Sequence, residues 1–303
     1  MALQTSGQIS ISDIQTELSS SSGSLTTLSL AASKTAPHGM KEFYGFSAGP
    51  AYNNTRYYQN DGTGDYIDCT TSTAPFNINT TQDLSFSMWV RQTGNKQNRV
   101  LFNFGNTNAN GNNRIFLSYS ANLNRFVFRY RSNSVNFDRQ WALHGTNGTA
   151  TGVTSSSTGW TSSSRGNVNS DGFCLLTVTY DASQSTATSA MKIYWNSSEL
   201  TSQAVANNGT RTAMAATKGR IGENLHLTNS AGNATLDYDE IKIFNKVLSA
   251  SEVTSLYNSG SIADSTQTVS SGLITEWTFD DNTVDDSNSE YTCTKVNGVI
   301  SSY

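Results

Sequence analysis

The chain has 303 residues, a net charge of −4 at neutral pH, and charged side chains at only 14% of its positions. Soluble proteins carry roughly 25% charged residues, so Ser, Thr, Asn and Gly supply most of the polarity here. Proteins that bind nucleic acid draw their affinity from Lys and Arg that neutralise phosphates, so this charge argues against a nucleic-acid partner. No apolar run approaches the roughly 20 residues that span a bilayer, which argues against membrane insertion.

The first segment, residues 1–48, differs in texture from the rest of the chain. A serine at the start of "SISDIQTEL" can cap a short helix with apolar residues at helical spacing, and "KEFYGF" forms an aromatic end. A segment with so few apolar side chains cannot build its own core. We therefore expect it to dock on another protein, with residues 49–55 as a linker. The residues assigned to docking are Ile11, Ile14, Leu18, Phe43, Tyr44 and Phe46.

From about residue 56 the pattern becomes all-β. Residues 84–92, "LSFSMWVRQ", alternate apolar and polar side chains, which predicts a half-buried strand. The runs "RVLFNFG", "RIFLSYS", "RFVFRYRS", "FCLLTVTYD" and "MKIYWNSSEL" come next, separated by Asn- and Gly-rich turns. Such runs predict antiparallel strands joined by hairpins. Three tryptophans fall within strand patterns and are predicted to be core residues: Trp89, Trp195 and Trp277.

One helix is predicted in the second half of the chain, within "LSASEVTSLYNSG". Ser249 is the expected N-cap, and Glu252 three residues later completes a capping box. Gly260 stands where a C-cap glycine belongs.

The stretch "LDYDEIKIF", residues 236–244, raises the question of catalysis, because glycosidases hold two carboxylates beside the scissile bond. On a strand, Asp237 and Asp239 share a face about 6.6 Å apart, while Glu240 points to the other face. The acidic row then continues as isoleucine at position 241, so it ends after two members. We predict no catalytic residue here. We expect these acids to pair with turn amides or with a nearby basic group such as Lys242 or Lys246.

The three cysteines, Cys69, Cys174 and Cys293, follow no metal-ligand spacing. We expect buried free thiols in a protein made in a reducing cytosol. A bridge between Cys69 and Cys293 is the alternative, because both lie in apparent strands near the two ends of the β domain.

Several motifs together resemble a known family. "YYQNDGTGDYIDC", "LSFSMWVR", "LLTVTYD", "MKIYWNSSEL", "GRIGEN" and "LDYDEIKIFNKVLSASEVTSLYNSG" follow the order seen in laminin-G-like, concanavalin A-like domains. The resemblance covers about residues 56–260 and implies an all-β, antiparallel jelly-roll sandwich over residues 56–303. Residues 272–299 resemble a strand pair that usually opens the domain, so we expect a circular permutation that completes the same sandwich. The alternative is a truncated second domain.

The same resemblance implies sugar binding without catalysis. A sugar site needs an exposed aromatic platform with polar donors around it, and the long segment 132–170 offers Trp141 and Trp160. Their alternative role is a buried lid. The residues at the base of this segment that complete the predicted site are Tyr130, Arg131 and Asn133.

Calcium is the one cofactor that the resemblance brings into consideration, because such domains sometimes bind it at the rim through oxygen ligands. The candidate ligands are Asp61, Asp65, Asp280 and Asp281, with Asp285 and Asp286 nearby. The alternative is that these aspartates stabilise turns through their own backbone contacts.

The leader "GQISISDIQTEL…SLTTLSLAASKTAPHGMKEFYGFS" resembles short leaders of structural proteins of tailed bacteriophages, such as tail fibres and tail appendages. This implies a virion protein made in the host bacterial cytoplasm. Residues 1–48 would bind other virion structural proteins, and the jelly roll would face outward to bind glycans, as a homo-oligomer. The alternatives are a purely architectural decoration protein and a glycan depolymerase.

Overall fold

The structure of the protein is a computed structural model with two compact units, Met1–Asn53 and Asn54–Tyr303 without a short stretch near residue 267. Among the described residues no helix is long and apolar enough to cross a membrane. The described residues are 3, 7–17, 21–31, 39–44, 56–62, 64–69, 81–92, 99–106, 113–120, 125–132, 135–142, 153–156, 159–162, 172–200, 204–207, 216–223, 235–258, 262, 269–279 and 293–302.

The first unit contains two α-helices and a 3-10 helix: α1 Ile11–Glu17, α2 Leu25–Ala31 and η1 Met40–Phe43. Helix α1 begins after Ser10, whose hydroxyl accepts a hydrogen bond from the Asp13 amide at 3.1 Å. The Asp13 carboxylate accepts one in return from the Ser10 amide at 2.7 Å. Each side chain therefore satisfies a backbone N–H group at the start of the helix.

The first unit has a small apolar core of its own. Ile14, Leu28 and Phe43 are fully buried against one another, with partly buried leucines, isoleucines and a methionine around them. The expectation that residues 1–48 cannot bury their own apolar side chains is therefore wrong. Of the six predicted docking residues, Ile14 and Phe43 lie in this core. Ile11 is partly buried and Tyr44 is 42% exposed, while Leu18 and Phe46 lie outside the described residues.

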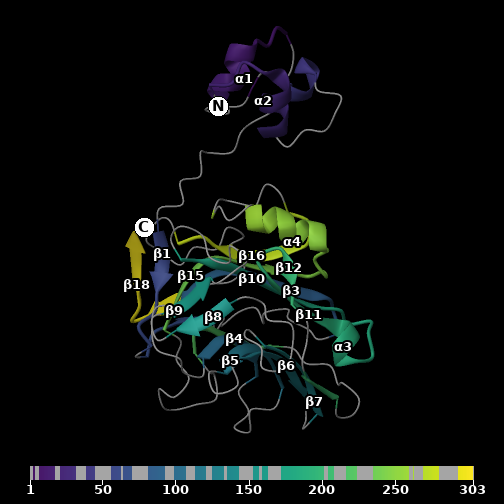
Figure 1. Ribbon diagram of the computed structural model, residues 1–303, viewed down its shortest axis with the longest axis vertical. Coiled ribbons are helices and arrows are strands. Elements are labelled where there is room, and N and C mark those ends of the chain that lie inside the picture. Colours follow the sequence, from purple (N-terminus) through teal and green to yellow (C-terminus); the bar gives the residue numbers. More distant parts are fainter. Residues whose placement is uncertain are drawn as a thin grey trace. The chain divides into compact units, whose positions relative to one another are not determined.

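The second unit contains two large antiparallel sheets and confirms the predicted all-β jelly-roll sandwich (Figure 1). Sheet A has the order β12-β11-β10-β3-β15-β1-β18, with β16 also paired to β15. Its strands are β1 Arg56–Gln59, β3 Leu84–Gln92, β10 Cys174–Tyr180, β11 Met191–Trp195, β12 Ser198–Glu199, β15 Leu236–Phe244, β16 Leu273–Trp277 and β18 Val299–Ser302.

Sheet B has the order β13-β7-β6-β5-β4-β14-β2-β17. Two further strands, β8 Val153–Ser156 and β9 Gly159–Ser162, pair only with each other, and α3 spans Ala187–Ala190. The strands of sheet B are β2 Tyr66–Asp68, β4 Arg99–Gly105, β5 Arg114–Ser120, β6 Arg125–Ser132, β7 Val135–Ala142, β13 Ala204–Asn207, β14 Lys218–Ile221 and β17 Thr294–Val296.

The main core lies between the two sheets and is rich in aromatic rings. Phe86 of sheet A stacks on Phe102 of sheet B, with ring centroids 4.3 Å apart. Gly219 leaves room for this layer, because a Cβ at that position would lie 2.3 Å from the ring of Phe104. The predicted core tryptophans Trp195 and Trp277 are buried here. The burial of this apolar layer is the main force that holds the sheets together.

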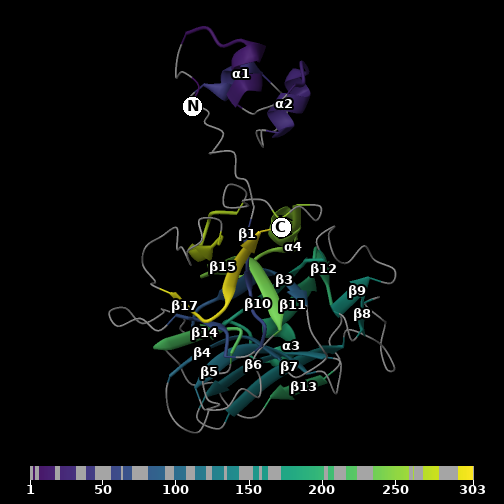
Figure 2. The same cartoon turned by 90° about the vertical axis from the view of Figure 1, so that its left-hand side faces the viewer.

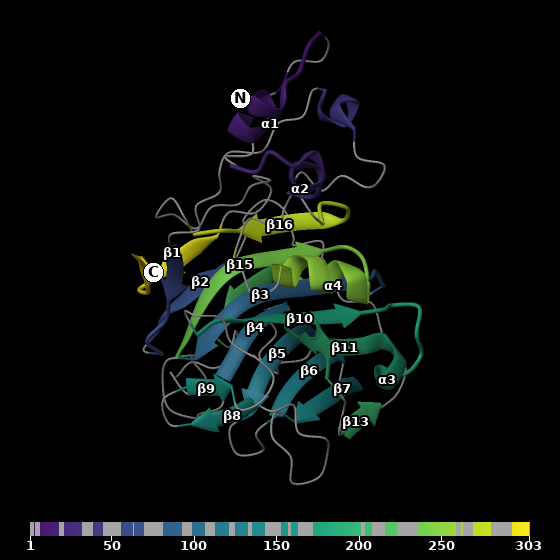
Figure 3. The same ribbon diagram turned by 45° about the horizontal axis from the view of Figure 1, so that its top comes forward.

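A second apolar layer covers the outer face of sheet A. Helix α4, Ala250–Tyr257, lies across this face (Figure 3), and Trp89 stacks on Tyr257 with centroids 5.9 Å apart. Strand β3 is therefore covered on both faces, and its outward Ser85 is fully buried, not exposed as the half-buried pattern predicted. The Ser85 hydroxyl donates to the Lys246 carbonyl at 2.7 Å and accepts from the Leu248 amide at 3.0 Å.

The last part of the chain contributes strands to both sheets. β16 pairs with β15, β17 pairs with β2, and β18 pairs with β1, so the first and last strands of the unit lie side by side (Figure 2). A disulfide joins Cys69, just after β2, to Cys293, just before β17. The expectation that these two cysteines are free thiols is therefore wrong. Cys174 is free and buried, as predicted.

Candidate functional site

Strand β15 holds the three acids that raised the question of catalysis, and Asp237 is the first of them. Its carboxylate is buried and accepts hydrogen bonds from Arg91 at 2.8 Å (Nε) and 2.6 Å (Nη2). Arg91 in turn lies over the rings of Tyr57 and Phe173, 4.5 and 4.6 Å from their centroids. Burial raises the pKa of Asp237 to about 6, although the Arg91 hydrogen bonds and charge act to lower it.

The other two acids of β15 lie at a β-bulge. Asp239 pairs with Trp89 and Lys242 with Ser87, so two residues of β15 lie opposite one residue of β3. Glu240 takes a left-handed backbone conformation with φ 45°, and its amide donates to the Asp239 carboxylate at 2.9 Å.

The bulge changes which side chains face the core. Tyr238 faces the main core before it and Ile241 and Ile243 face the same core after it, so the isoleucines do not continue the acidic row as predicted.

Lys242 sits between two buried carboxylates, Glu240 of its own strand and Glu276 of β16, and its Nζ makes an ion pair with each. All three side chains are 1% exposed. Burial alone would lower the pKa of Lys242, but the two carboxylates outweigh it and hold that pKa above its usual range. Lys246, the other expected partner, pairs instead with Glu252 of α4. The acids of β15 are thus buried and held by basic groups or backbone, which favours a structural role.

The calcium candidates Asp61 and Asp65 lie in a tight loop after β1. The Asp61 amide donates to the Asp65 carboxylate at 2.9 Å, and the Asn60 side-chain amide donates to the Asp65 carbonyl at 2.8 Å. Burial raises the pKa of Asp65, and the charge of Asp61 adds to the rise.

Asp280 and Asp281 lie outside the described residues. Within the described part of the chain, no three His, Cys, Asp or Glu side chains come together as a metal site. Calcium binding at this loop stays a prediction, and the Asp65 contacts fit the alternative role of an aspartate that stabilises a turn.

Two residues of the predicted sugar site cannot contribute to an exposed aromatic platform. Tyr130 and Trp141 are fully buried in the core between the sheets, where Tyr130 lies 6.2 Å from Tyr180 between ring centroids. A ring that is covered on both faces cannot stack on a sugar, so these two assignments are corrected. Arg131 is partly exposed on sheet B. The Asn133 position and the Trp160 side chain lie outside what the structure describes.

Polar and charged side chains surround Arg131 on the outer face of sheet B. In β5, β6 and β7, every second residue points away from the core, and the strand register places these outward residues beside one another. Phe116 pairs with Arg129, Arg129 pairs with Asp138, and Arg114 pairs with Arg131. We call these five residues the arginine face; its strands lie on the side of the unit opposite α4 (Figure 1).

Close contacts hold four of the five side chains of the arginine face. The Arg129 Nε atom lies 2.5 Å from the Asp138 carboxylate. The Phe116 ring lies against two guanidinium groups, with the Cζ atoms of Arg114 and Arg129 4.4 and 5.4 Å from its centroid. Cation–π contacts of this kind stabilise the cations and hold their planes in place.

The electrostatics of the arginine face show crowding of positive charge. The pKa of Arg114 is lowered to about 10, mostly by burial and then by the charges of Arg131 and Arg129. The pKa of Arg131 is lowered by burial and then by Arg129. Burial raises the pKa of Asp138, against the opposing charge of Arg129. An anion placed on this face would relieve the repulsion among the arginines.

Four members of the arginine face were not found from the sequence. The signal was present in "RIFLSYS" and "RFVFRYRS", where the core residues alternate with arginines on the opposite face of each strand. Finding the site also required the pairing of Arg114 with Arg131 and of Arg129 with Asp138, which depends on hairpin register.

The two stacked antiparallel sheets and the polar outer face of sheet B define a lectin-like β-sandwich. A family model described as the concanavalin A-like lectin/glucanases superfamily matches residues 61–254, and the chain belongs to this family. No curated protein matches the chain in sequence.

Among solved structures, the chain is similar to three proteins at low identity. A proposed carbohydrate-binding protein of Bacteroides ovatus is 11% identical, with a TM-score of 0.47 over 85% of this chain and 62% of that one. The heptameric SAP-like pentraxin of Limulus polyphemus is 10% identical, with a TM-score of 0.45 over 82% and 95%. Domains LG4-5 of the mouse laminin α1 chain are 11% identical, with a TM-score of 0.40 over 68% and 46%.

Proposed function

We propose that the chain is a non-enzymatic structural protein of a bacteriophage virion that presents its jelly roll for binding to glycans. The observation that carries the glycan-binding part is the arginine face, a set of hydrogen-bonding side chains held on rigid strands in a member of a lectin-containing family. Sites built on strands position their groups more precisely than sites on loops.

The state of the β15 acids supports a role without catalysis. A glycosidase needs two carboxyl groups that reach the scissile bond from a shared cleft. Asp237 is covered by Arg91, and Glu240 is enclosed with Lys242 in the interior of the unit. Neither carboxylate meets that requirement in this conformation.

The proposed place on a virion is supported by the leader. Its sequence resembles phage leaders, and it forms a compact unit separate from the jelly roll. Its partners are other virion structural proteins. Tyr44, 42% exposed, is the described docking candidate that lies outside its apolar core, whereas Ile11 packs against that core. Assembly as a homo-oligomer fits this role, because several copies raise the avidity of individually weak sugar contacts.

A glycan array probed with the full chain tests the binding function. We expect retention of a subset of glycans by the folded protein and none by the heat-denatured protein. The same glycans are then incubated with the protein and assayed for new reducing ends. Retention without release of reducing ends supports a binding protein, whereas release would favour a depolymerase. No retention of any glycan would contradict the function and favour an architectural role.

Immunogold electron microscopy of intact phage particles tests the location, with an antibody raised against residues 50–303. We expect label at a defined place on the particle. Label on the tail or its tip supports a fibre or appendage that meets the host. Label spread over the capsid supports a head fibre or decoration protein. Particles that carry no label would contradict the virion assignment.

A further inference from the structure

The arginine face concentrates positive charge in a chain whose overall charge is −4. Arg114, Arg129 and Arg131 come from two adjacent strands, and among the described residues of this face Asp138 is the acid placed beside them. Arg220, on the neighbouring strand β14, is different, because it lies 3.7 Å from the Asp68 carboxylate and 2.5 Å from the Glu223 carboxylate.

Four of the five side chains of the arginine face are held in place before any ligand arrives; they are those of Arg114, Phe116, Arg129 and Asp138. Phe116 has only 6% of its surface exposed because Arg114 and Arg129 lie against its ring. Arg129 is held from the other side by Asp138. Side chains that are already ordered lose little conformational entropy on binding, which favours a recognition surface over a solvated charge cluster.

On this face, the buried Oδ1 atom of Asp138 and the buried Nε atom of Arg131 have no hydrogen-bond partner among the described residues. Asp138 is 4% exposed, so its second oxygen lies in a largely desolvated position. Burying an unsatisfied acceptor of this kind is unfavourable for folding. The two residues are diagonal neighbours on β7 and β6, which places their Cα atoms about 7–8 Å apart.

These two atoms require opposite chemistry from a ligand. The Asp138 oxygen accepts a hydrogen bond, and a sugar hydroxyl is a suitable donor. The Arg131 N–H donates, and its strongest acceptor is a carboxylate or sulfate oxygen, which also offsets the charge of Arg114 and Arg129. An inorganic anion offers no hydroxyl array, and a neutral sugar leaves the positive charge uncompensated. An acidic sugar meets both requirements.

We propose that the arginine face binds an acidic glycan, with the anionic group of one sugar on Arg131 and Arg114 and a hydroxyl of the same or the next sugar on Asp138. The proposal rests on the proposed glycan-binding function and names the class of glycan. Carboxylate-bearing and sulfated polymers share the required chemistry, and the experiment separates them.

The test measures binding of the full chain to immobilised polymers by biolayer interferometry. The acidic probes are polygalacturonate and polysialic acid, which carry carboxylates, and heparin, which carries mostly sulfates. The uncharged probes are fully methyl-esterified polygalacturonate, which keeps the same backbone, and dextran. The Arg131→Gln variant removes one charge from the arginine face. Lys192→Gln is the matched control, because it removes one charge from an exposed pair with Glu199 on sheet A.

We expect at least one acidic polymer to bind and its uncharged counterpart to bind about tenfold more weakly or not at all, since the uncharged polymer offers no charge-assisted hydrogen bond. Arg131→Gln should weaken that binding by about tenfold, while Lys192→Gln changes it by less than about twofold. An unchanged melting temperature in both variants shows that folding is intact.

Three results would overturn the proposal. Equal binding of the acidic polymers and their uncharged counterparts removes the role of the anion. Equal losses in Arg131→Gln and Lys192→Gln reduce the effect to overall charge. Binding of neutral polymers alone contradicts the acidic class but leaves the glycan-binding function standing, whereas binding of no polymer here and no glycan on the array contradicts both.

Discussion

Lys242 holds two carboxylates inside the unit, Glu240 from its own strand and Glu276 from β16, and none of the three side chains is more than 1% exposed. A buried charge is costly unless it is paired. Removing the lysine would leave two carboxylates together in a desolvated place, and one or both would have to bind a proton for the fold to persist.

We therefore expect Lys242→Met to lower the free energy of unfolding by about 3–5 kcal/mol at neutral pH. The matched control is Lys246→Met, because Lys246 and Glu252 are 26% and 32% exposed and such a pair is worth less than about 1 kcal/mol. Urea denaturation of both variants measures the difference. If the Lys242 variant unfolds at the same urea concentration as the control, the buried ion pairs do not have the assigned role.

Asp237 makes the stability of the protein depend on pH. Its pKa is about 6 in the folded protein because burial outweighs the effect of Arg91, against a value of 3.8 for the exposed group. The folded state thus binds this proton more tightly than the unfolded state. The resulting stabilisation is fully present below about pH 4 and is lost as the pH rises through about 6.

We expect the advantage of the natural protein over Asp237→Asn to decline between pH 4 and pH 7, by an amount on the order of 2–3 kcal/mol. Urea unfolding curves at one-unit steps of pH give the difference directly. A difference that grows with pH would mean that the Arg91 ion pair, and not burial, controls this carboxyl group.

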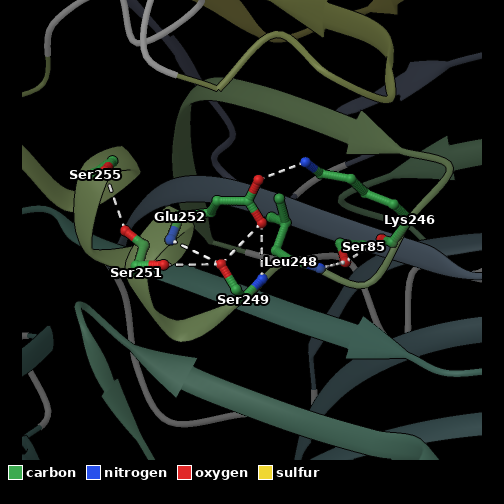
Figure 4. Close-up of polar contacts among 7 residues, drawn as sticks. All are labelled: Ser85, Lys246, Leu248, Ser249, Ser251, Glu252 and Ser255. Atoms are coloured by element: carbon green, nitrogen blue, oxygen red, sulfur yellow. Dashed lines mark hydrogen bonds and ion pairs between the residues drawn. The ribbon is translucent and has the colours of Figure 1, made fainter. Parts of the chain in front are cut away.

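Helix α4 depends on its first turn, which Figure 4 shows in detail. The Ser249 hydroxyl accepts from the Glu252 amide at 3.3 Å, and the Glu252 carboxylate accepts from the Ser249 amide at 2.9 Å. This is the predicted capping box. The other end differs from the prediction, because Asn258, with φ 42°, takes the left-handed position that was assigned to Gly260. Asparagine tolerates this conformation better than most residues.

We expect Ser249→Ala to destabilise the protein by about 1 kcal/mol, the usual cost of a lost N-cap. Ser255→Ala serves as the control, since Ser255 is exposed and its hydroxyl donates only to the Ser251 carbonyl within the helix (Figure 4). Thermal unfolding followed by circular dichroism compares the two. Equal melting temperatures for both variants would show that the cap does not limit the stability of this layer.

The sequence patterns predicted the strands well but not all of their surroundings. Alternation in residues 84–92 identified β3, yet nothing local showed that α4 would cover its outer face. The bulge in β15 also escaped prediction, because it arises where Glu240 leaves the regular strand and shifts every later side chain by one face. Both features depend on contacts between elements far apart in the chain.

The site was harder to predict than the fold for the same physical reason. Tyr130 and Trp141 were assigned to a sugar platform because aromatic residues suit one, but the same rings also fill a core, and here they do. Arg131 was among the residues of the predicted site, whereas Arg114 and Asp138 lie beside it only through the register of three strands. The sequence shows which side chains are present, but the pairing of strands decides which of them become neighbours.

At the scale of the whole molecule, the last part of the chain closes the sandwich. β16 pairs with β15 in sheet A, whereas β18 pairs with β1 in sheet A and β17 pairs with β2 in sheet B. β17 and β18 therefore lie next to strands from the start of the unit. The Cys69–Cys293 bridge joins residues separated by 224 positions at this closure. A cross-link over so long a segment restricts the unfolded chain strongly, which favours the folded state by roughly 2–5 kcal/mol.

Two measurements on the purified protein test this bridge. Thiol titration after denaturation without reductant should detect one cysteine, Cys174, and titration after reduction should detect three. Reduction should also lower the midpoint of urea unfolding of the natural protein. It should not change the midpoint of the double variant Cys69→Ser/Cys293→Ser, which has no bridge to lose. Three thiols before reduction would show that the cysteines remain unpaired.

If the proposed synthesis in a bacterial cytoplasm holds, the bridge forms only after the protein leaves that reducing compartment, because such compartments keep thiols reduced.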